Sequence, residues 1–186
     1  MTDELDRRVR RTRERLTQAL VSLCREKPYG DIRMTELLER ADVGRATFYA
    51  HYRDKEDLLI STFLGMIDHF EAVGLQRNPD AVLPAASFLL QHFHEAKEFG
   101  RALARAGKME VLLRACEARL RRNLEARLPP RADPPPAITA AVAAGAFTTA
   151  VNQWMNAGSQ TPPELLADQL ERLLAPGVRA AEAAAV

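Results

Sequence analysis

The chain has 186 residues, of which 47% are hydrophobic and 27% are charged. This length lets one domain, or a small domain joined to a larger one, bury a core without metal ions or disulfides, and the composition excludes a disordered polymer. The two cysteines are too few for a disulfide framework and lie in no metal-binding spacing, which points to a reducing compartment.

The terminus and the apolar stretches bear on localisation. The N-terminal residues are charged and no apolar run follows them, so we expect no secretory signal. The longest weakly polar stretch, residues 137–151, is shorter than the roughly 20 residues that a membrane span needs. We therefore expect a soluble cytoplasmic protein without a membrane partner.

The net charge of +1 conceals an uneven distribution. Between Arg7 and Arg15, six arginines stand against one acidic residue, Glu14, so this stretch carries a local charge of +5. Screening limits each charge to a range of about 8 Å at physiological salt, so such a block acts locally. It is either a solvated helix start or a phosphate-binding surface.

Apolar residues recur at three- and four-residue steps along the whole chain, which predicts helices and no strand. The breaks include Pro28-Tyr29-Gly30 and the proline-rich stretch 129–136. Asp54 is the expected N-cap of the fourth helix, with Asp57 in a variant capping box, and Thr161 is the expected cap of the ninth. The predicted helices cover about residues 6–27, 34–41, 45–51, 54–77, 84–97, 98–106, 108–128, 136–157 and 161–176.

This order of elements predicts an all-α chain of about nine helices. We expect a three-helix N-terminal domain at residues 1–53 and a larger helical bundle at residues 54–176. The Ala-rich end, residues 177–186, is expected to be a frayed tail.

The second and third helices are short and joined by a tight turn, which is a helix-turn-helix arrangement whose second helix fits the major groove of DNA. That second helix carries Arg45, Thr47, Tyr49 and His51, which can all bond to phosphates or base edges. Lys55 begins the next helix, where the helix dipole disfavours a cation unless a phosphate arrives. The alternative for Lys55 is a pair with a neighbouring carboxylate.

The segment from Ile32 to Leu59 resembles the DNA-binding domain of the TetR family of transcriptional regulators. Its Ala-x-Val turn, its Thr-Phe-Tyr-x-His-Tyr core and the Lys-Glu-x-Leu that follows match the family in order and spacing. The resemblance implies a homodimeric repressor that reads a palindromic operator and releases it when an effector binds the C-terminal helices, with Phe48 and Tyr52 in the core. The positions expected to contact DNA are Arg33, Thr35, Gly44, Arg45, Ala46, Thr47, Tyr49, His51 and Lys55.

Three features depart from the family's pattern. Arg33 stands where members usually have Thr, so the usual cap of the second helix is missing and Arg33 can reach a phosphate instead. Asp42 stands where the turn usually has Gly, and Asp tolerates a positive φ better than most residues, so we expect the turn to survive. The arginine block at residues 7–15 is heavier than the fold requires, and it is a candidate N-terminal arm along the minor groove or flanking phosphates.

The eighth and ninth predicted helices carry the expected dimer interface. On the eighth, a stripe of small residues at four-residue spacing lets another helix approach closely, and the ninth offers a leucine face. We expect a four-helix interface between two subunits; the alternative is that the small residues pack only within one subunit. The candidate interface residues are Ala141, Gly145, Thr149, Leu166, Leu170 and Leu173.

Large apolar residues of the fourth to eighth helices are candidates for an effector pocket. Such a lining suits an apolar or aromatic small molecule, although each residue is also explained as simple core. The candidates are Phe63, Met66, Ile67, Phe70, Phe88, Met109, Leu112, Cys116, Phe147, Val151 and Trp154.

No catalytic or cofactor-binding motif occurs in the sequence, so we expect no enzymatic activity, no cofactor and no metal site. His92 and His94 are two residues apart and point to different sides of a helix, which is wrong for one ion. Cys116 is either a buried structural thiol or a redox sensor. The competing function is a helical small-molecule carrier or interaction protein that keeps this fold without specific DNA binding.

Overall fold

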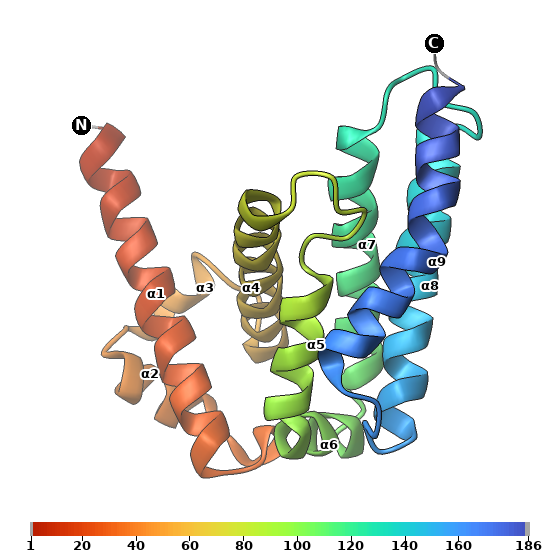
Figure 1. Ribbon diagram of the computed structural model, residues 1–186. Helices are drawn as coiled ribbons and strands as arrows, with labels where there is room; N and C mark the ends of the chain where they lie inside the picture. The colour runs from red at the N-terminus through yellow and green to blue at the C-terminus, as the bar shows by residue number, and fades with distance from the viewer. Residues whose placement is uncertain (1, 185–186) are drawn as a thin grey trace. The chain divides into compact units, whose positions relative to one another are not determined.

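The computed structural model describes residues 2–184, and every regular element within that range is helical (Figure 1). The all-α prediction and the predicted order of the helices are therefore confirmed. The α-helices are α1 Thr2–Glu26, α2 Met34–Ala41, α3 Arg45–Tyr49, α4 Lys55–Arg77, α5 Ala86–Glu95, α6 Lys97–Arg105, α7 Met109–Arg127, α8 Pro136–Asn156 and α9 Pro163–Ala183. A short 3-10 turn, η1 Tyr29–Asp31, precedes α2 and was not predicted.

The helix starts show where local signals decide the structure. Asp54 caps α4 as expected, because its Oδ1 accepts a hydrogen bond from the Asp57 amide at 2.8 Å. Thr161 does not cap α9. Pro162 precedes a second proline and is held extended, with ψ at 138°, so the helix starts later, at Pro163. The Thr161 carbonyl instead accepts a hydrogen bond from Nε1 of Trp154 at 2.8 Å.

The C-terminal end of α9 corrects the expected frayed tail. The helix continues past Pro176 to Ala183 because Val178 and Ala181 are buried there. The carbonyl of Ala181 also accepts a hydrogen bond from the amide of Asp133, at 3.2 Å. Packing thus holds a segment whose composition alone predicts fraying, and residues 185–186 lie outside the described part of the chain.

The chain divides into two compact units. Unit 1 comprises the residues up to Phe63 together with Glu98–Met109, and unit 2 comprises Leu64–Lys97 and the residues from Glu110 onward. This division differs from the expected boundary after residue 53, because Leu58 and Leu59 of α4 are buried in unit 1. A second reason is an ion pair between Lys108 and Glu56, which ties the segment after α6 to the same unit.

Unit 1 is built on one small core. The leucines of α1 lie on a helix that packs against α2, and they are at most 1% exposed. α1 also makes a polar contact with α4, because the hydroxyl groups of Thr17 and Thr62 are 3.2 Å apart. The most deeply buried side chains of this core are Leu16, Leu20, Leu23, Leu37, Phe48 and Leu58.

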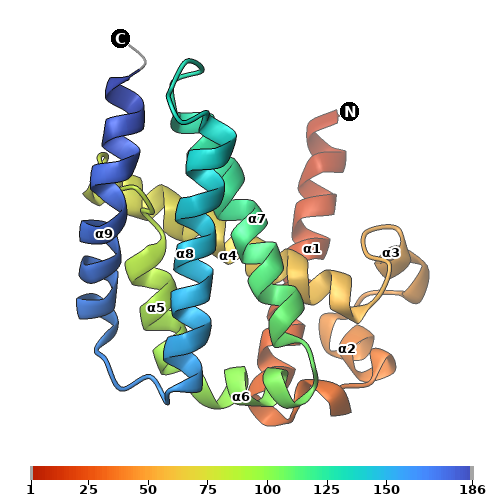
Figure 2. The ribbon, with the colours of Figure 1, turned by 90° about the vertical axis from the view of Figure 1, so that its right-hand side faces the viewer.

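Unit 2 is a helical bundle in which α9 packs against both α5 and α8 (Figure 2). Its core side chains have no exposed surface and include Leu89, Leu90, Cys116, Phe147 and Val151. The loop between α4 and α5 is part of this core. Arg127 of α7 donates to the carbonyls of Ala81 and Val82 at 2.8 and 2.9 Å, and Glu171 of α9 accepts from the Val82 amide at 3.1 Å.

α4 is the helix of the described chain that comes nearest to a membrane span. It has 23 residues, and its most apolar 18-residue window has a mean hydropathy of 1.4. The sequence estimate missed it and chose residues 137–151 instead. Leu58, Leu59 and Ile67 of α4 are buried, but only 28% of this window is buried in all. One helix that meets the length and hydropathy test is weak evidence for a membrane segment.

Candidate nucleic-acid interface

The turn between α2 and α3 keeps the geometry expected of a helix-turn-helix. Asp42 adopts a left-handed conformation, with φ at 50° and ψ at 51°. Its amide bonds to the carbonyl of Glu39 at 3.1 Å, and the Val43 amide bonds to the carbonyl of Leu38 at 3.0 Å, which closes α2. The carboxylate of Asp42 is bound by the guanidinium of Arg15 on α1. The turn therefore tolerates aspartate in place of glycine, and the side chain attaches the turn to α1.

Phe48 anchors α3 in the core of unit 1. Phe48 has no exposed surface, and its ring lies 5.3 Å from the Tyr49 ring and 5.8 Å from the Tyr52 ring. Phe48 and Tyr52 are both buried, as expected. The amides of His51 and Tyr52 both bond to the Phe48 carbonyl at 2.9 Å, so the helix ends before His51 and is shorter than predicted.

The outer face of α3 presents polar and cationic groups to solvent. Gly44, Arg45, Ala46 and Thr47 are exposed, and Tyr49 is 51% exposed. His51 is half-buried beside Tyr52, at a ring distance of 6.4 Å. This face matches the requirement for reading a groove, because its polar atoms are not covered by the rest of unit 1.

The cations around α3 differ in their partners. Among the described side chains, that of Arg45 makes no hydrogen bond or ion pair, and neither does that of Arg33, which precedes α2 and provides no side-chain cap. Thr35 is exposed on the same segment. The two arginines and this hydroxyl are thus free to bond to an external partner, and both arginines carry a fixed positive charge.

Lys55 is placed differently from the expectation of a phosphate contact. Its ammonium donates to the carbonyl of Tyr29 at 2.8 Å and to that of Ile32 at 2.7 Å, and it lies 4.3 Å from the centre of the Tyr29 ring. Partial burial lowers the pKa of Lys55, and burial raises that of Tyr29. The carboxylate pair weighed as the alternative is also not what is observed. Lys55 braces η1, a turn that sequence analysis treated only as a helix break.

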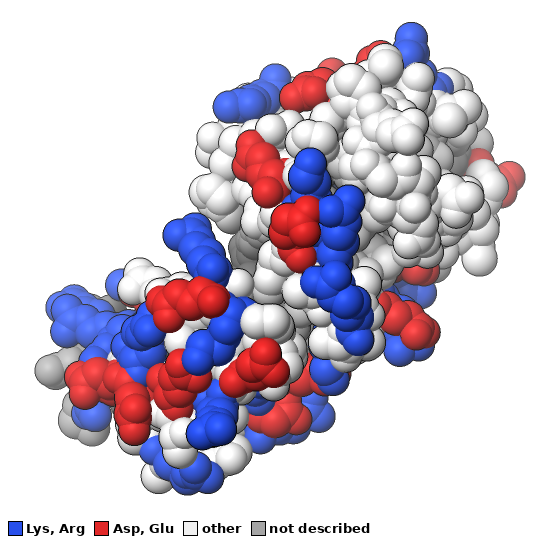
Figure 3. Space-filling view, turned by 90° about the horizontal axis from the view of Figure 1, so that it is seen from below, with Lys and Arg blue, Asp and Glu red and all other residues white. Residues whose placement is uncertain are grey.

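The flank of α2 carries charges that are already paired. Arg40 makes two hydrogen bonds to the Glu26 carboxylate, at 2.6 and 3.0 Å, and Lys27 bonds to Glu36 at 2.5 Å. The bond from Arg40 lowers the pKa of Glu26, and the bond from Lys27 lowers that of Glu36. On the face shown in Figure 3, basic and acidic side chains lie interleaved in the same way.

In unit 2, the expected dimer residues divide into inward and outward groups. Leu170 is buried, and Gly145 faces α7, since a Cβ there would lie 3.9 Å from Oε1 of Glu117. Ala141 and Leu166 are half-buried. Thr149 and Leu173 point to solvent, with Leu173 76% exposed. The structure adds three exposed apolar side chains that sequence analysis missed, namely Ile138, Val142 and Leu165.

The expected effector residues also divide. Phe63 and Met109 belong to unit 1. Ile67, Leu112, Cys116, Phe147, Val151 and Trp154 are buried in unit 2, whereas Met66, Phe70 and Phe88 are half-buried there.

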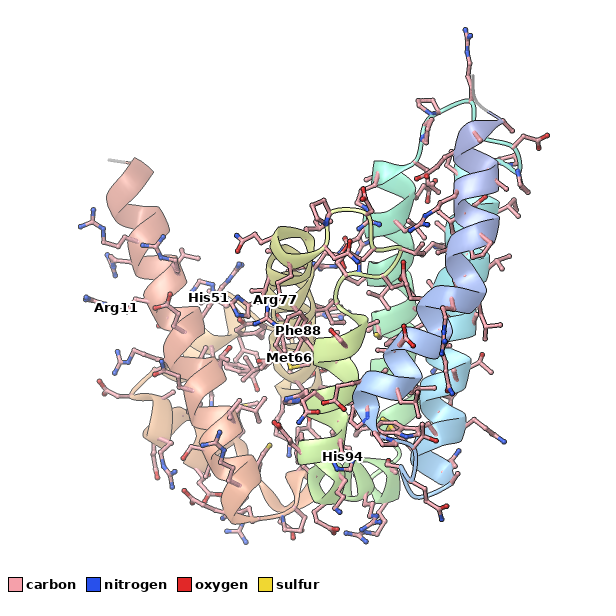
Figure 4. The ribbon with its side chains drawn as sticks, viewed as in Figure 1. Arg11, His51, Met66, Arg77, Phe88 and His94 are labelled. Atoms are coloured by element: carbon pink, nitrogen blue, oxygen red, sulfur yellow. The ribbon has the colours of Figure 1, made fainter. Side chains whose placement is uncertain are left out.

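The half-buried residues form an aromatic cluster in unit 2. The rings of Phe70 and Phe88 stack at 5.6 Å, with the guanidinium of Arg77 4.9 Å from the Phe88 ring (Figure 4). His92 lies 6.2 Å from Phe70, and burial lowers its pKa. Sequence analysis did not include Arg77 or His92 in the candidate pocket, because a charged or titratable residue gives no sign of stacking on an aromatic ring.

The thiols are not activated. Cys116 is fully buried, and burial raises its pKa to about 12. Cys24 is half-buried, and burial raises its pKa to about 11. Because the thiolate is the reactive form, both side chains match buried structural thiols rather than redox sensors.

Comparisons with known proteins agree with the geometry of unit 1. The family of bacterial regulatory proteins named tetR matches residues 16–62. Over 57 residues the chain is 44% identical to YxbF of Bacillus subtilis (strain 168), an uncharacterized HTH-type transcriptional regulator. That alignment covers 30% of this chain and 15% of YxbF, so the chain spans only a small part of this relative's length.

Two solved structures resemble the whole fold. One is DhaS, the dihydroxyacetone kinase operon activator, with a TM-score of 0.60 and 19% identity over 92% of this chain and 98% of that one. The other is the fatty acid degradation regulator FadR from Bacillus halodurans, with a TM-score of 0.51 and 17% identity over 89% of this chain and 99% of that one. The family match and the YxbF alignment identify residues 16–62 as a helix-turn-helix segment of the TetR family of transcriptional regulators, and the two solved structures share the all-helical fold of the chain.

Proposed function

We propose that this regulator binds a palindromic operator as a homodimer and represses transcription until a small effector releases it. The observation that carries the proposal is the outer face of α3, where Arg45 is exposed and its side chain has no partner in the described part of the chain, while Phe48 packs into the core on the inner face. A short helix held rigidly on a core, with its cation unpaired, is suited to insertion into a major groove.

The roles on DNA follow from the chemistry of the side chains. Arg45 stands at the first position of α3, from which a guanidinium can donate to both major-groove acceptors of guanine. Thr47 and Tyr49 carry hydroxyl groups suited to phosphates, and the exposed Arg33 and Thr35 extend this set. Gly44 and Ala46 leave room for a close approach of the DNA.

The homodimer is supported by the exposed apolar side chains of unit 2. Ile138 and Val142 of α8 are 56% and 64% exposed, and Leu165 and Leu173 of α9 are 45% and 76% exposed. Large apolar side chains exposed on two adjacent helices are costly in water and favour a partner surface. A two-fold dimer would present two copies of α3 to half-sites about 34 Å apart, as a palindrome requires.

Effector control is supported by an aromatic cluster in unit 2. The half-buried aromatic cluster of Phe70 and Phe88, with Met66 on the same helix as Phe70, supports an apolar or aromatic ligand in unit 2. Such a ligand would lower DNA affinity only if it binds the DNA-incompetent conformation more tightly. A coupling free energy of about 1–3 kcal/mol is typical of allosteric proteins. A function on DNA supports a cytoplasmic location.

The test is fluorescence anisotropy with the DNA upstream of the chain's own gene, near about 150 mM salt and with excess random competitor, conditions under which specific sites typically bind at nanomolar protein. We expect saturable binding with two subunits per site, and a reporter fused to that DNA should be more active when the gene is deleted. A reporter that loses activity instead would identify an activator. Binding no tighter than to random DNA, there and in a genomic selection, would favour the carrier function.

A further inference from the structure

A groove opens in unit 1 between the first half of α1 and the start of α4, close to the end of α3. Its volume is about 470 Å³, and its lining includes Arg10, Arg13 and Glu14 of α1 and Ser61 of α4. Tyr52 also lines it, and Tyr52 packs against Phe48, the anchor of α3, at 5.8 Å. The groove therefore adjoins the recognition segment without including any of its exposed residues.

The groove is positively charged and its charge is poorly neutralised. Arg13 makes no hydrogen bond or ion pair with any residue that the structure describes. Arg10 approaches Glu14 only to 3.9 Å, and both side chains are largely exposed, so this pair is weak. Arg8 and Arg11 on the same half of α1 are also exposed and have no partner among the described side chains, and Figure 4 shows Arg11 pointing outward. By contrast, Arg15 at the next turn is bound to Asp42.

The helical form of this stretch limits what it can bind. α1 already includes residues 7–15, so the arginines are carried on a helix and not on an extended arm. An α-helix with side chains is about 10–12 Å wide, whereas the minor groove of B-DNA is about 6 Å wide. The helix cannot enter the minor groove, so the expected minor-groove arm does not fit, and the sugar–phosphate backbone is the accessible partner.

We propose that this groove is a second DNA-contact surface, in which Arg10 and Arg13 hold backbone phosphates flanking the base pairs read by α3. Three residues apart on a helix, the two guanidinium groups lie on one face and can reach neighbouring phosphates of one strand. The hydroxyl group of the exposed Ser61 offers a further donor on the opposite wall. This inference rests on the proposed function and adds contacts that widen the DNA footprint.

Glu14 allows the direction of a change in DNA affinity to be predicted. It is the acidic residue among the groove's lining side chains, and it stands beside both arginines on the helix. A phosphate in the groove would be repelled by this carboxylate. The variant Glu14→Gln should therefore bind DNA more tightly than the wild type, which a purely structural role for the stretch does not predict.

The experiment uses duplexes of about 40 base pairs that the full-length wild-type protein enriches from a random pool, and measures the slope of log K against log salt. The double variant Arg10→Gln/Arg13→Gln should reduce the magnitude of this negative slope by about 1.8 per bound subunit, since each phosphate contact contributes about 0.9. The variant Arg10→Lys/Arg13→Lys should keep the slope. The matched control Arg121→Gln/Arg122→Gln removes the same charge from exposed positions of α7 that have no partner among the described residues, and it should leave the slope unchanged.

Shortening the selected duplex from both ends sharpens the result. The slope of the wild type should fall once the flanking phosphates are removed, while that of the double Gln variant should stay constant. Circular dichroism confirms that each variant is folded. An unchanged slope in the double Gln variant, or an equal loss in the α7 control, overturns this inference while leaving the proposed function intact. Failure of the wild type to enrich any sequence overturns both.

Discussion

α2 and α3 are separated by only three residues, yet they treat their charged side chains in opposite ways. Arg40 of α2 is held by two hydrogen bonds to Glu26, and Glu36 of α2 is bound by Lys27. Arg45 of α3 has no such partner among the described residues. Charges that fasten α2 to α1 are thus satisfied within the chain, whereas the charge on α3 is left for an external ligand. Internal pairing distinguishes scaffold from contact surface better than the type of residue does.

The largest effect on stability should come from removing the buried side chain of Phe48 in α3. Phe48→Ala removes a fully buried ring and should lower the free energy of unfolding by about 3–5 kcal/mol, because a cavity remains in a small core. Urea denaturation followed by circular dichroism measures this loss. Tyr49→Ala is the control on the exposed face and should change stability by no more than about 0.5 kcal/mol. Equal losses in the two variants would mean that α3 is not anchored as described.

A substitution of Lys55 tests whether this cation stabilises the fold or contacts DNA. Lys55→Met removes two charge-assisted hydrogen bonds to the carbonyls of η1 and should destabilise the protein by about 1.5–3 kcal/mol. The salt dependence of DNA binding should stay the same, because a brace contributes no phosphate contact. If stability is unchanged while the salt slope falls by about 0.9, Lys55 is a phosphate contact and belongs with Arg45.

Arg45 should show the opposite pattern. Arg45→Ala should weaken binding to the selected operator by about 1–3 kcal/mol, with little change on random DNA, because it removes a base contact. The unfolding midpoint should not move, since the side chain has no internal partner. Competition anisotropy on both DNAs measures the difference. Equal losses on the two DNAs would show that Arg45 contacts phosphate and does not read a base.

The smallest effect is expected on the flank of α2. The Arg40 bond lowers the pKa of Glu26, so the pair stabilises the folded state above the ordinary glutamate pKa and is lost as the pH falls through the lowered value. Arg40→Ala should therefore be slightly less stable than the wild type at neutral pH and equal to it in acid. DNA binding should not change. A stability difference that persists in acid would contradict the role of this pair.

Local signals in the sequence were sufficient for the order of the helices but not for every helix end. The Asp54 cap and the turn at Asp42 depend on neighbours within a few residues, whereas the burial of Phe48 was expected from the resemblance to the TetR family. The partners of Lys55 could not be predicted in this way, because the carbonyls of Tyr29 and Ile32 lie 26 and 23 residues away in the sequence. Only the fold brings them to the start of α4.

The same limit applies to unit 2. Four-residue spacing predicts that Gly145 shares a face of α8 with Ala141 and Thr149, but it does not predict the neighbour of that face, and in the structure Gly145 faces Glu117 of α7. The exposed apolar side chains lie a short step around the helix, at Ile138 and Val142. Similarly, an apolar residue at helical spacing has the same pattern in a core and in a pocket. For this reason the residues predicted to line an effector pocket include both fully buried and half-buried positions.

Two glycines of α4 differ in the substitutions that they would tolerate during evolution. At Gly65 nothing lies within 4 Å of the place where a Cβ would stand, so alanine and larger residues fit there and favour the helix. At Gly74 a Cβ would lie 2.1 Å from the carbonyl oxygen of Pro84, a backbone atom fixed in the buried loop before α5. In any large collection of functional variants, position 65 should therefore be diverse and position 74 should be occupied by glycine alone.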